Sequence, residues 1–200
     1  MDLTCFKAYD IRGRIPDQLN TDVAWKIGKA YAQWLAPKTV IVGWDIRLSS
    51  PAMSQALIEG LISSGVDVRS LGECGTEEVY FATEHFNADG GIMVTASHNP
   101  KDYNGMKLVQ AGSVPISGDS GLEEIKQLVA AGVFADAGTR GRLESLDHRQ
   151  AYINRLLTYL PDVNAEPRLK IVVNAGNGGA GAVIDLLEAA LPFEFIKVHH

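Results

Sequence analysis

The sequence predicts an α/β fold, in which a layered and mostly parallel sheet is flanked by helices and is followed by the start of a second, similar domain. Short β-branched runs such as Thr-Val-Ile-Val at 39–42 alternate with longer stretches of helical periodicity. This alternation is typical of buried strands joined by crossover helices. A further apolar run, Leu-Lys-Ile-Val-Val at 169–173, follows a polar segment. We therefore place a first domain at 1–140 and a linker helix plus an incomplete second domain at 141–200.

Period-2 and β-branched patterns give the expected strands. They cover residues 4–9, 39–43, 66–71, 91–95, 105–109 and 169–173. Apolar side chains at helical spacing, bounded by capping residues, proline or glycine, give the expected helices. They cover residues 21–35, 51–64, 77–86, 121–131, 147–160 and 182–190. Asn20 or Thr21, Ser50 and Ser120 are the expected caps of the first, second and fourth of these helices.

Composition excludes several classes of protein. A formal net charge of −6 and 8% aromatic residues argue against a nucleic-acid partner, because no basic stripe or aromatic platform is present. No apolar run approaches the roughly 18 residues of a membrane span, and residues 1–10 lack a signal-peptide layout. We therefore expect a cytoplasmic protein without a membrane partner. Cys5 and Cys74 lack the spacing of a metal or redox pair and are expected to be buried thiols.

The most informative stretch is residues 90–109, where a polar loop separates two apolar runs. Pro100 biases the preceding residue toward an extended backbone, so Ser97 and His98 are expected on a constrained turn. A serine hydroxyl needs neighbours that move protons and offset charge before it can attack or carry a phosphoryl group. His98 and Lys107 are side chains of that kind. The loop is therefore the candidate reactive site.

Three segments carry a resemblance to a known family. Thr-Ala-Ser-His-Asn-Pro-Lys-Asp-Tyr-Asn-Gly-Met-Lys-Leu-Val at 95–109 resembles the active-site serine segment of the α-D-phosphohexomutases. Phe-Lys-Ala-Tyr-Asp-Ile-Arg-Gly at 6–13 resembles their amino-terminal signature. With Gly-Thr-Glu-Glu-Val-Tyr-Phe-Ala-Thr at 75–83, the match looks closest to the bacterial phosphomannomutases. The resemblance implies an isomerase that moves a phosphoryl group within a hexose phosphate.

The resemblance also implies roles for individual residues. Ser97 would carry the phosphoryl group, His98 and Lys107 would handle protons and charge, and Arg12 would hold phosphate oxygens with its planar guanidinium. The phosphate-binding set would be Tyr9, Arg12, Asn99 and Lys107. The family further implies Mg²⁺, touching the phosphoserine at Ser97, and a hexose 1,6-bisphosphate activator. Its metal-binding D-x-D-x-D loop does not occur in this sequence.

The same resemblance implies an amino-terminal piece of a longer enzyme, which we expect to be inactive alone. We further expect the face near Leu186 to Val198 of its incomplete second domain to favour self-association. Gly-Thr-Glu-Glu at 75–78 favours mannose 6-phosphate and mannose 1-phosphate as the interconverted pair. A phosphoglucomutase or phosphoglucosamine mutase remains the alternative. Asp45 and Arg47 are expected to form an ion pair that shapes their loop rather than to touch substrate.

Two other classes of function compete with the mutase interpretation. Gly-Asn-Gly-Gly-Ala-Gly, from Gly176 to Gly181, matches G-x-G-x-x-G between a strand and a helix, which permits a phosphate- or nucleotide-binding module. The acidic residue expected about 20 positions later is absent, so a tight turn is the favoured interpretation. A Ser-His hydrolase is disfavoured because the G-x-S-x-G elbow is missing.

Overall fold

The computed structural model describes residues 3–160 and 169–200. These residues form two compact units, Met1–Leu146 and Asp147–His200. The boundary expected at residue 140 lies before β7 (Leu143–Ser145), a short strand that pairs with the first sheet. The interpretation of the two units as a serine-bearing domain and the start of a second domain stays a prediction.

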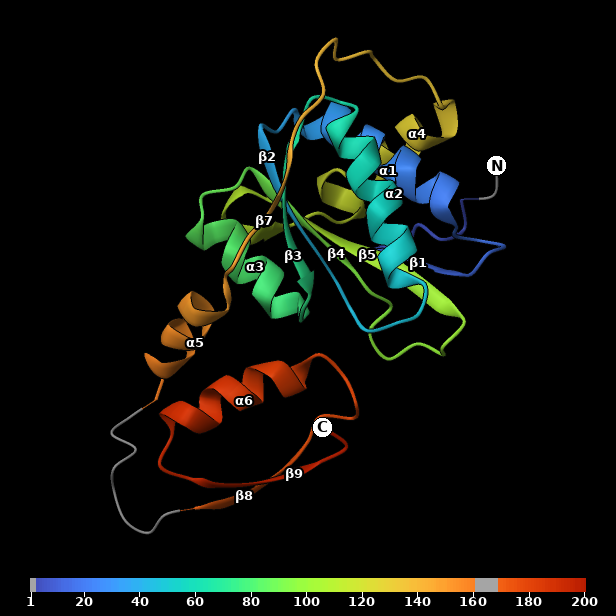
Figure 1. Cartoon of the computed structure of the whole chain (residues 1–200). Helices are drawn as coiled ribbons and strands as arrows, with labels where there is room; N and C mark the ends of the chain where they lie inside the picture. Colours follow the sequence, from blue (N-terminus) through green and yellow to red (C-terminus); the bar gives the residue numbers. More distant parts are fainter. Residues whose placement is uncertain (1–2, 161–168) are drawn as a thin grey trace. The chain divides into compact units, whose positions relative to one another are not determined.

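The first unit is built on one mixed sheet with the strand order β1-β5-β4-β2-β3-β7, and a further strand, β6, pairs with β5 (Figure 1). Strands β2 (Thr39–Trp44), β3 (Asp67–Glu73), β4 (Gly90–Val94) and β7 run parallel. Strands β1 (Ile11–Arg14) and β5 (Tyr103–Gln110) add an antiparallel part, and β6 is Val114–Pro115. The predicted α/β class is confirmed, with a parallel part and an antiparallel part that meet at β4.

Helices cover both faces of this sheet. The first unit contains α1 (Thr21–Leu35), α2 (Ser50–Ile62), α3 (Thr76–His85), α4 (Leu122–Ala131) and two short 3₁₀ turns, η1 (Ala111–Ser113) and η2 (Gly118–Ser120). Alternate residues of the central strands face opposite layers: Val40 and Val42 join the core beneath α1, α2 and α4, whereas Ile41 joins the core beneath α3. Figure 1 shows α3 on the opposite side of the sheet from α1 and α2. A sheet buried on both faces explains the continuous apolar strands of the sequence.

The second unit contains α5 (Arg149–Leu157), β8 (Lys170–Asn174), α6 (Ala180–Ala190) and β9 (Glu194–Val198). Its two strands pair in parallel. This is one strand-helix-strand unit, in which Val172 and Ile196 remain exposed to 65% and 40%. Two paired strands with exposed apolar residues form a minimal sheet compared with that of the first unit.

One of the expected helix caps is confirmed, whereas two other caps and one strand are wrong. Asn20 caps α1, accepting a hydrogen bond from the Val23 N–H at 3.1 Å. The strand predicted at 4–9 is wrong, because this segment forms turns and a single bridge, and the strand begins at Ile11. The cap predicted at Ser50 is also wrong, because its hydroxyl donates to Asp45 and the cap position is Ser49. Ser120 does not cap α4, which follows Gly121.

Candidate active site

The candidate site lies on the loop that joins β4 to β5, residues 95–102. Ser97 has φ 55°, so a serine occupies the left-handed region that favours glycine. Its side chain is exposed, and its hydroxyl oxygen lies 3.3 Å from Nδ1 of the exposed His98. Non-glycine residues in this region cost about 1–2 kcal/mol and persist where the surroundings hold them. The loop therefore presents one hydroxyl to solvent at an energetic cost.

Arg47 holds the backbone of this loop. Its NH2 nitrogen donates to the carbonyl oxygens of Ser97 and Asn99 at 2.9 and 2.6 Å. Its NH1 nitrogen donates to the carbonyl oxygens of Pro100 and Tyr103 at 2.7 and 3.0 Å. The expected ion pair with Asp45 is confirmed, with Nε 3.4 Å from Oδ2. Arg47 thus contacts the loop at 95–102 as well as the loop between β2 and α2, in which it lies.

A second set of hydrogen bonds anchors the start of the loop. Asp45 Oδ2 accepts from the Thr95 hydroxyl at 2.6 Å, and the Thr95 oxygen in turn accepts from the Ser97 N–H at 2.9 Å. Asp45 Oδ1 accepts from the Ser50 hydroxyl at 2.6 Å. The side chain of the buried Asn104 donates to that same Ser50 oxygen at 3.0 Å. The left-handed conformation of Ser97 is therefore stabilised by a connected network of hydrogen bonds among Asp45, Thr95, Ser50 and Asn104.

Two cations share one carboxylate beside the loop. Oδ2 of Asp10 accepts from Nε of Arg12 at 2.9 Å and lies 3.2 Å from Nζ of Lys107. NH1 of Arg12 donates to the side-chain oxygen of Asn99 at 2.8 Å, which ties Arg12 to the reactive loop. Two positive charges against one negative charge leave a net positive cluster, suited to an anion.

Gly105 permits this arrangement. Arg12 on β1 pairs with Gly105 on β5. A Cβ at Gly105 would lie 2.0 Å from the Ile11 carbonyl oxygen and 2.9 Å from that of Thr95. Only glycine allows the two strands to approach so closely, which explains the glycine of the Asn-Gly-x-Lys segment.

Helix α3 adds a neutral neighbour to this cluster. Burial is the main cause that raises the pKa of Tyr80, and the carboxylates of Glu77 and Asp10 raise it further. The Tyr80 phenol is therefore protonated at neutral pH. Tyr80 lies two positions after the Gly-Thr-Glu-Glu segment at 75–78.

The structure brings most of the predicted site residues together and adds one. Arg12, Asn99 and Lys107 are connected through hydrogen bonds and Asp10, while Ser97 and His98 are neighbours on the loop. Tyr9 is 81% exposed. Asp10, which links both cations, was missed by the sequence reasoning. Its signal was the Asp-x-Arg spacing at 10–12, since residues two apart in an extended segment face the same side.

The described residues do not form a complete metal site. Among residues 3–160 and 169–200, no group of three or more His, Cys, Asp or Glu is placed to hold a metal ion. A Mg²⁺ at the Ser97 phosphate would need further ligands. In the same part of the chain, no helix is long and apolar enough to cross a membrane.

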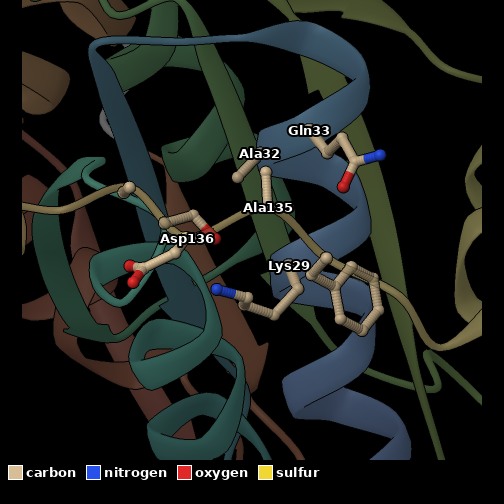
Figure 2. A pocket seen from close by; sticks show the side chains of 8 residues that line it. Lys29, Ala32, Gln33, Ala135 and Asp136 are labelled. Carbon is tan, nitrogen blue, oxygen red and sulfur yellow. The ribbon is translucent and has the colours of Figure 1, made fainter.

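A separate pocket lies between α1 and the segment after α4. It has a volume of about 110 Å³ and includes Lys29, Gln33 and Asp136 in its lining (Figure 2). Lys29 is only 7% exposed and donates to the Ser63 carbonyl oxygen at 3.3 Å. None of the predicted site residues lines this pocket. We assign it no function.

Comparison with known proteins agrees with the geometry. A family model described as phosphoglucomutase/phosphomannomutase, alpha/beta/alpha domain I, matches residues 4–136. The chain is 55% identical over 206 residues to a phosphomannomutase of Salmonella montevideo. It is 54% identical over 200 residues to a Xanthomonas campestris pv. campestris protein named phosphohexose mutases. Each match covers 100% of this chain but only 45% and 44% of the relative, so the chain spans less than half their length.

A solved structure gives the same result. The crystal structure of a phosphoglucomutase/phosphomannomutase family protein from Burkholderia thailandensis matches with a TM-score of 0.87 and 36% sequence identity. That match covers 100% of this chain and 44% of the solved chain. The chain thus belongs to the phosphoglucomutase/phosphomannomutase family, and residues 4–136 match its domain I.

Proposed function

We propose that this chain carries the phosphoserine part of a phosphomannomutase, which interconverts mannose 6-phosphate and mannose 1-phosphate. Ser97 is the phosphoryl carrier, and a hexose bisphosphate is the intermediate. The observation that supports this most directly is that the exposed Ser97 lies two residues before Asn99, whose side chain accepts a hydrogen bond from Arg12 of the net positive cluster of Arg12, Lys107 and Asp10. A phosphoryl group carries about −1.5 to −2 charges at neutral pH, so it needs such neighbours.

The proposed step is a phosphoryl transfer with a defined proton path. The Ser97 oxygen forms a bond to phosphorus of a hexose bisphosphate, and the bond from that phosphorus to the sugar oxygen breaks. His98 is within reach of the hydroxyl proton, since its Nδ1 lies 3.3 Å from the Ser97 oxygen and such contacts tighten when substrate binds. The proton lost by serine is balanced by the proton gained by the sugar oxygen, which leaves a hexose monophosphate.

Arg12 and Lys107 are proposed to bind the transferred group. Phosphoryl transfer depends mainly on positioning and on neutralising charge at the phosphate oxygens. Arg12 has a planar fork suited to two oxygens, and Lys107 supplies a compact charge. Asn99, which accepts from Arg12 at 2.8 Å, fixes the direction of that fork. We propose Tyr9, which is exposed, as a further phosphate-binding side chain.

Mg²⁺ and a hexose 1,6-bisphosphate activator remain part of the proposal. Mg²⁺ would offset charge on the phosphoryl oxygens, but the described residues provide no complete ligand set for it. We therefore assign no step to the metal and predict that the 200-residue chain alone shows no mutase turnover. Turnover of mannose 6-phosphate by this chain would contradict that prediction.

Mannose is the proposed sugar because relatives 55% and 56% identical to this chain are named phosphomannomutases. Phosphoglucomutase activity is the second candidate, since the matching family model spans both activities. Comparing phosphoryl transfer from mannose 1,6-bisphosphate and from glucose 1,6-bisphosphate separates the two. Faster transfer from the glucose compound would favour the second candidate.

Intact-mass measurement tests the carrier role of Ser97. The chain is incubated with a hexose 1,6-bisphosphate and Mg²⁺, and a gain of about 80 Da is expected. Ser97→Ala should abolish the gain. Ser113→Ala is the matched control, because Ser113 also has a positive φ, of 58°, but its hydroxyl donates to the Tyr80 carbonyl. An unmodified wild-type chain, or a gain that survives Ser97→Ala, contradicts the proposal.

Self-association through the second unit also stays a prediction. Leu169, Val172 and Ile196 are exposed to 54%, 65% and 40%. Exposed apolar residues on so small a unit favour association. Light scattering across a range of concentrations is the test, and a constant monomer mass would contradict it.

A further inference from the structure

The guanidinium of Arg47 is fully engaged by the two loops that it joins. An arginine has five N–H donors in a fixed plane. Four go to the carbonyl oxygens of residues 97, 99, 100 and 103, at 2.6–3.0 Å. The fifth, on Nε, faces Asp45 Oδ2 at 3.4 Å. Four hydrogen bonds and one ion-pair contact thus surround the guanidinium, a pattern that lysine, with three donors on one nitrogen, cannot reproduce.

The four carbonyl oxygens converge on the guanidinium of Arg47. Their partial negative charges repel one another, and the positive charge of Arg47 between them offsets this repulsion. The Arg47 side chain is only 14% exposed, so solvent replaces its bonds poorly. Residues 97 and 99 flank His98 and include the left-handed position of Ser97. The backbone direction at Ser97 therefore depends on a side chain that lies 50 residues earlier in the chain.

The anchors at Thr95 hold only the amide side of Ser97. Thr95 accepts from the Ser97 N–H, whereas Arg47 binds the Ser97 carbonyl oxygen. Opposite ends of one residue are thus fixed by Asp45 through two routes, since Asp45 contacts both Thr95 and Arg47. Removing Arg47 leaves the hydrogen bonds from Asp45 through Thr95 to the Ser97 N–H intact. We therefore expect the unit to stay folded while the Ser97 carbonyl oxygen loses its partner.

We propose that Arg47 is the positioning residue of the reactive loop: its guanidinium holds the carbonyl oxygens of residues 97, 99, 100 and 103 and thereby keeps Ser97 in its left-handed backbone conformation. The expected effect of Arg47 on phosphoryl transfer rests on the function proposed above, whereas its expected effect on the order of the loop is independent of that function. Arg47 touches neither the phosphoryl group nor a proton that moves.

The first measurement is independent of catalysis. Amide hydrogen exchange is followed by NMR for Ser97, Asn99 and Tyr103, whose N–H groups donate to Thr95, Ala96 and Pro100. In Arg47→Ala these three amides should exchange at least about tenfold faster. Amides of β2 should keep their wild-type rates. Arg140→Ala, which removes an exposed ion pair with Glu59, is the matched control and should leave the loop unchanged.

The second measurement separates positioning from support of the fold. The rate of mass gain at Ser97 from a hexose 1,6-bisphosphate should fall at least about 100-fold in both Arg47→Lys and Arg47→Ala. Added guanidinium ion, at millimolar concentration, should restore part of the Arg47→Ala rate and none of the Arg47→Lys rate. A variant weakened only in stability would show no restoration, because millimolar guanidinium leaves the unfolding free energy almost unchanged.

The outcomes decide the proposal in each case. Wild-type exchange of the loop amides in Arg47→Ala overturns it, and so does a wild-type rate of mass gain in Arg47→Lys. If the wild-type chain gains no mass, the carrier function fails, whereas the exchange data still decide whether Arg47 orders the loop. If Arg47→Ala does not fold, the exchange measurement is made on Arg47→Lys, which keeps the charge and the apolar stem.

Discussion

The loop after β4 and the loop after β8 share a backbone feature but differ in what holds them. Ser97 and Asn177 have φ values of 55° and 54°. The first loop is held by charged and hydroxyl side chains, those of Arg47, Asp45 and Thr95. In the second, the N–H groups of residues 176, 177 and 178 donate to Asn174, His199 and Ala175.

This difference supports the proposal that the first loop is reactive and that the second is a structural turn. A phosphate-binding glycine loop needs backbone N–H groups that point at the ligand. In residues 176–178 the N–H groups already have acceptors within the chain, which disfavours the nucleotide-binding alternative for this segment. Around residues 95–102, backbone groups are bound by the scaffold, and Arg12 and Lys107 supply the charge. A left-handed residue after a strand is therefore insufficient by itself to indicate a site.

The largest expected effect comes from the glycine beneath the first loop. Gly105→Ala places a Cβ 2.0 Å from the Ile11 carbonyl oxygen, and backbone on both sides prevents relaxation. We expect a loss of about 3 kcal/mol in unfolding free energy. Urea unfolding followed by tryptophan fluorescence reports on the first unit, because all three tryptophans lie at 25, 34 and 44. A change below about 1 kcal/mol would contradict the close approach.

A smaller loss is expected from the carboxylate that supports the first loop. Asp45→Asn replaces an oxygen that accepts from Thr95 and faces Arg47 with an amide N–H₂ group. We expect a cost of about 2 kcal/mol in unfolding free energy. The Thr95 hydroxyl and the Arg47 guanidinium, both hydrogen-bond donors, would then face the N–H₂ group, which is also a donor. The same urea titration measures it, and Asp17→Asn, at an exposed ion pair, is the control. Equal midpoints for the two variants would show that the network contributes little.

A gain in stability is expected where the first loop is strained. Ser97→Gly removes a Cβ from a left-handed residue and should stabilise the first unit by about 1 kcal/mol. Asn177→Gly should gain less, because asparagine tolerates this conformation better than serine. Calorimetry and hydrogen exchange compare the two variants. A loss of stability in Ser97→Gly would mean that the serine conformation costs nothing.

The smallest effect is expected in the second unit. A Cβ at Gly181 would meet His200 at 3.5 Å, which is an ordinary contact, and the residue lies within α6. Gly181→Ala should therefore stabilise that helix by about 0.5 kcal/mol. Amide exchange within α6 measures it. Faster exchange in the variant would show that this glycine, like Gly105, is required by close packing.

Patterns in the sequence predicted the local elements better than the contacts between them. The helix at 21–35 and its cap depend on neighbouring residues; the helix was predicted correctly, and Asn20, one of the two expected caps, is the residue that caps it. The strand predicted at 4–9 was wrong, because loose alternation is also compatible with turns, and the ladder with β5 begins only at Ile11. Local patterns do not indicate such pairing.

The candidate site shows the same limit. Ser97, His98 and Asn99 were evident from one continuous motif, whereas the hydrogen bond from Arg12 to Asn99 spans 87 positions. Only the resemblance to a family pointed to Arg12. Neither source indicated that Asp10 joins Arg12 to Lys107 or that Arg47 reaches the carbonyl groups of the loop.

The pairing of β1 with β5 has a consequence for the order of folding. Ile11 pairs with Met106, so the strand that carries Arg12 gains its partner only after the chain has been synthesised past β4 and has folded back on itself. Closing so long a segment is slow, and its entropy cost precedes any contact energy. A nascent chain can thus pair β2, β3 and β4 before β5 is complete, while the strand that carries Arg12 is paired only later.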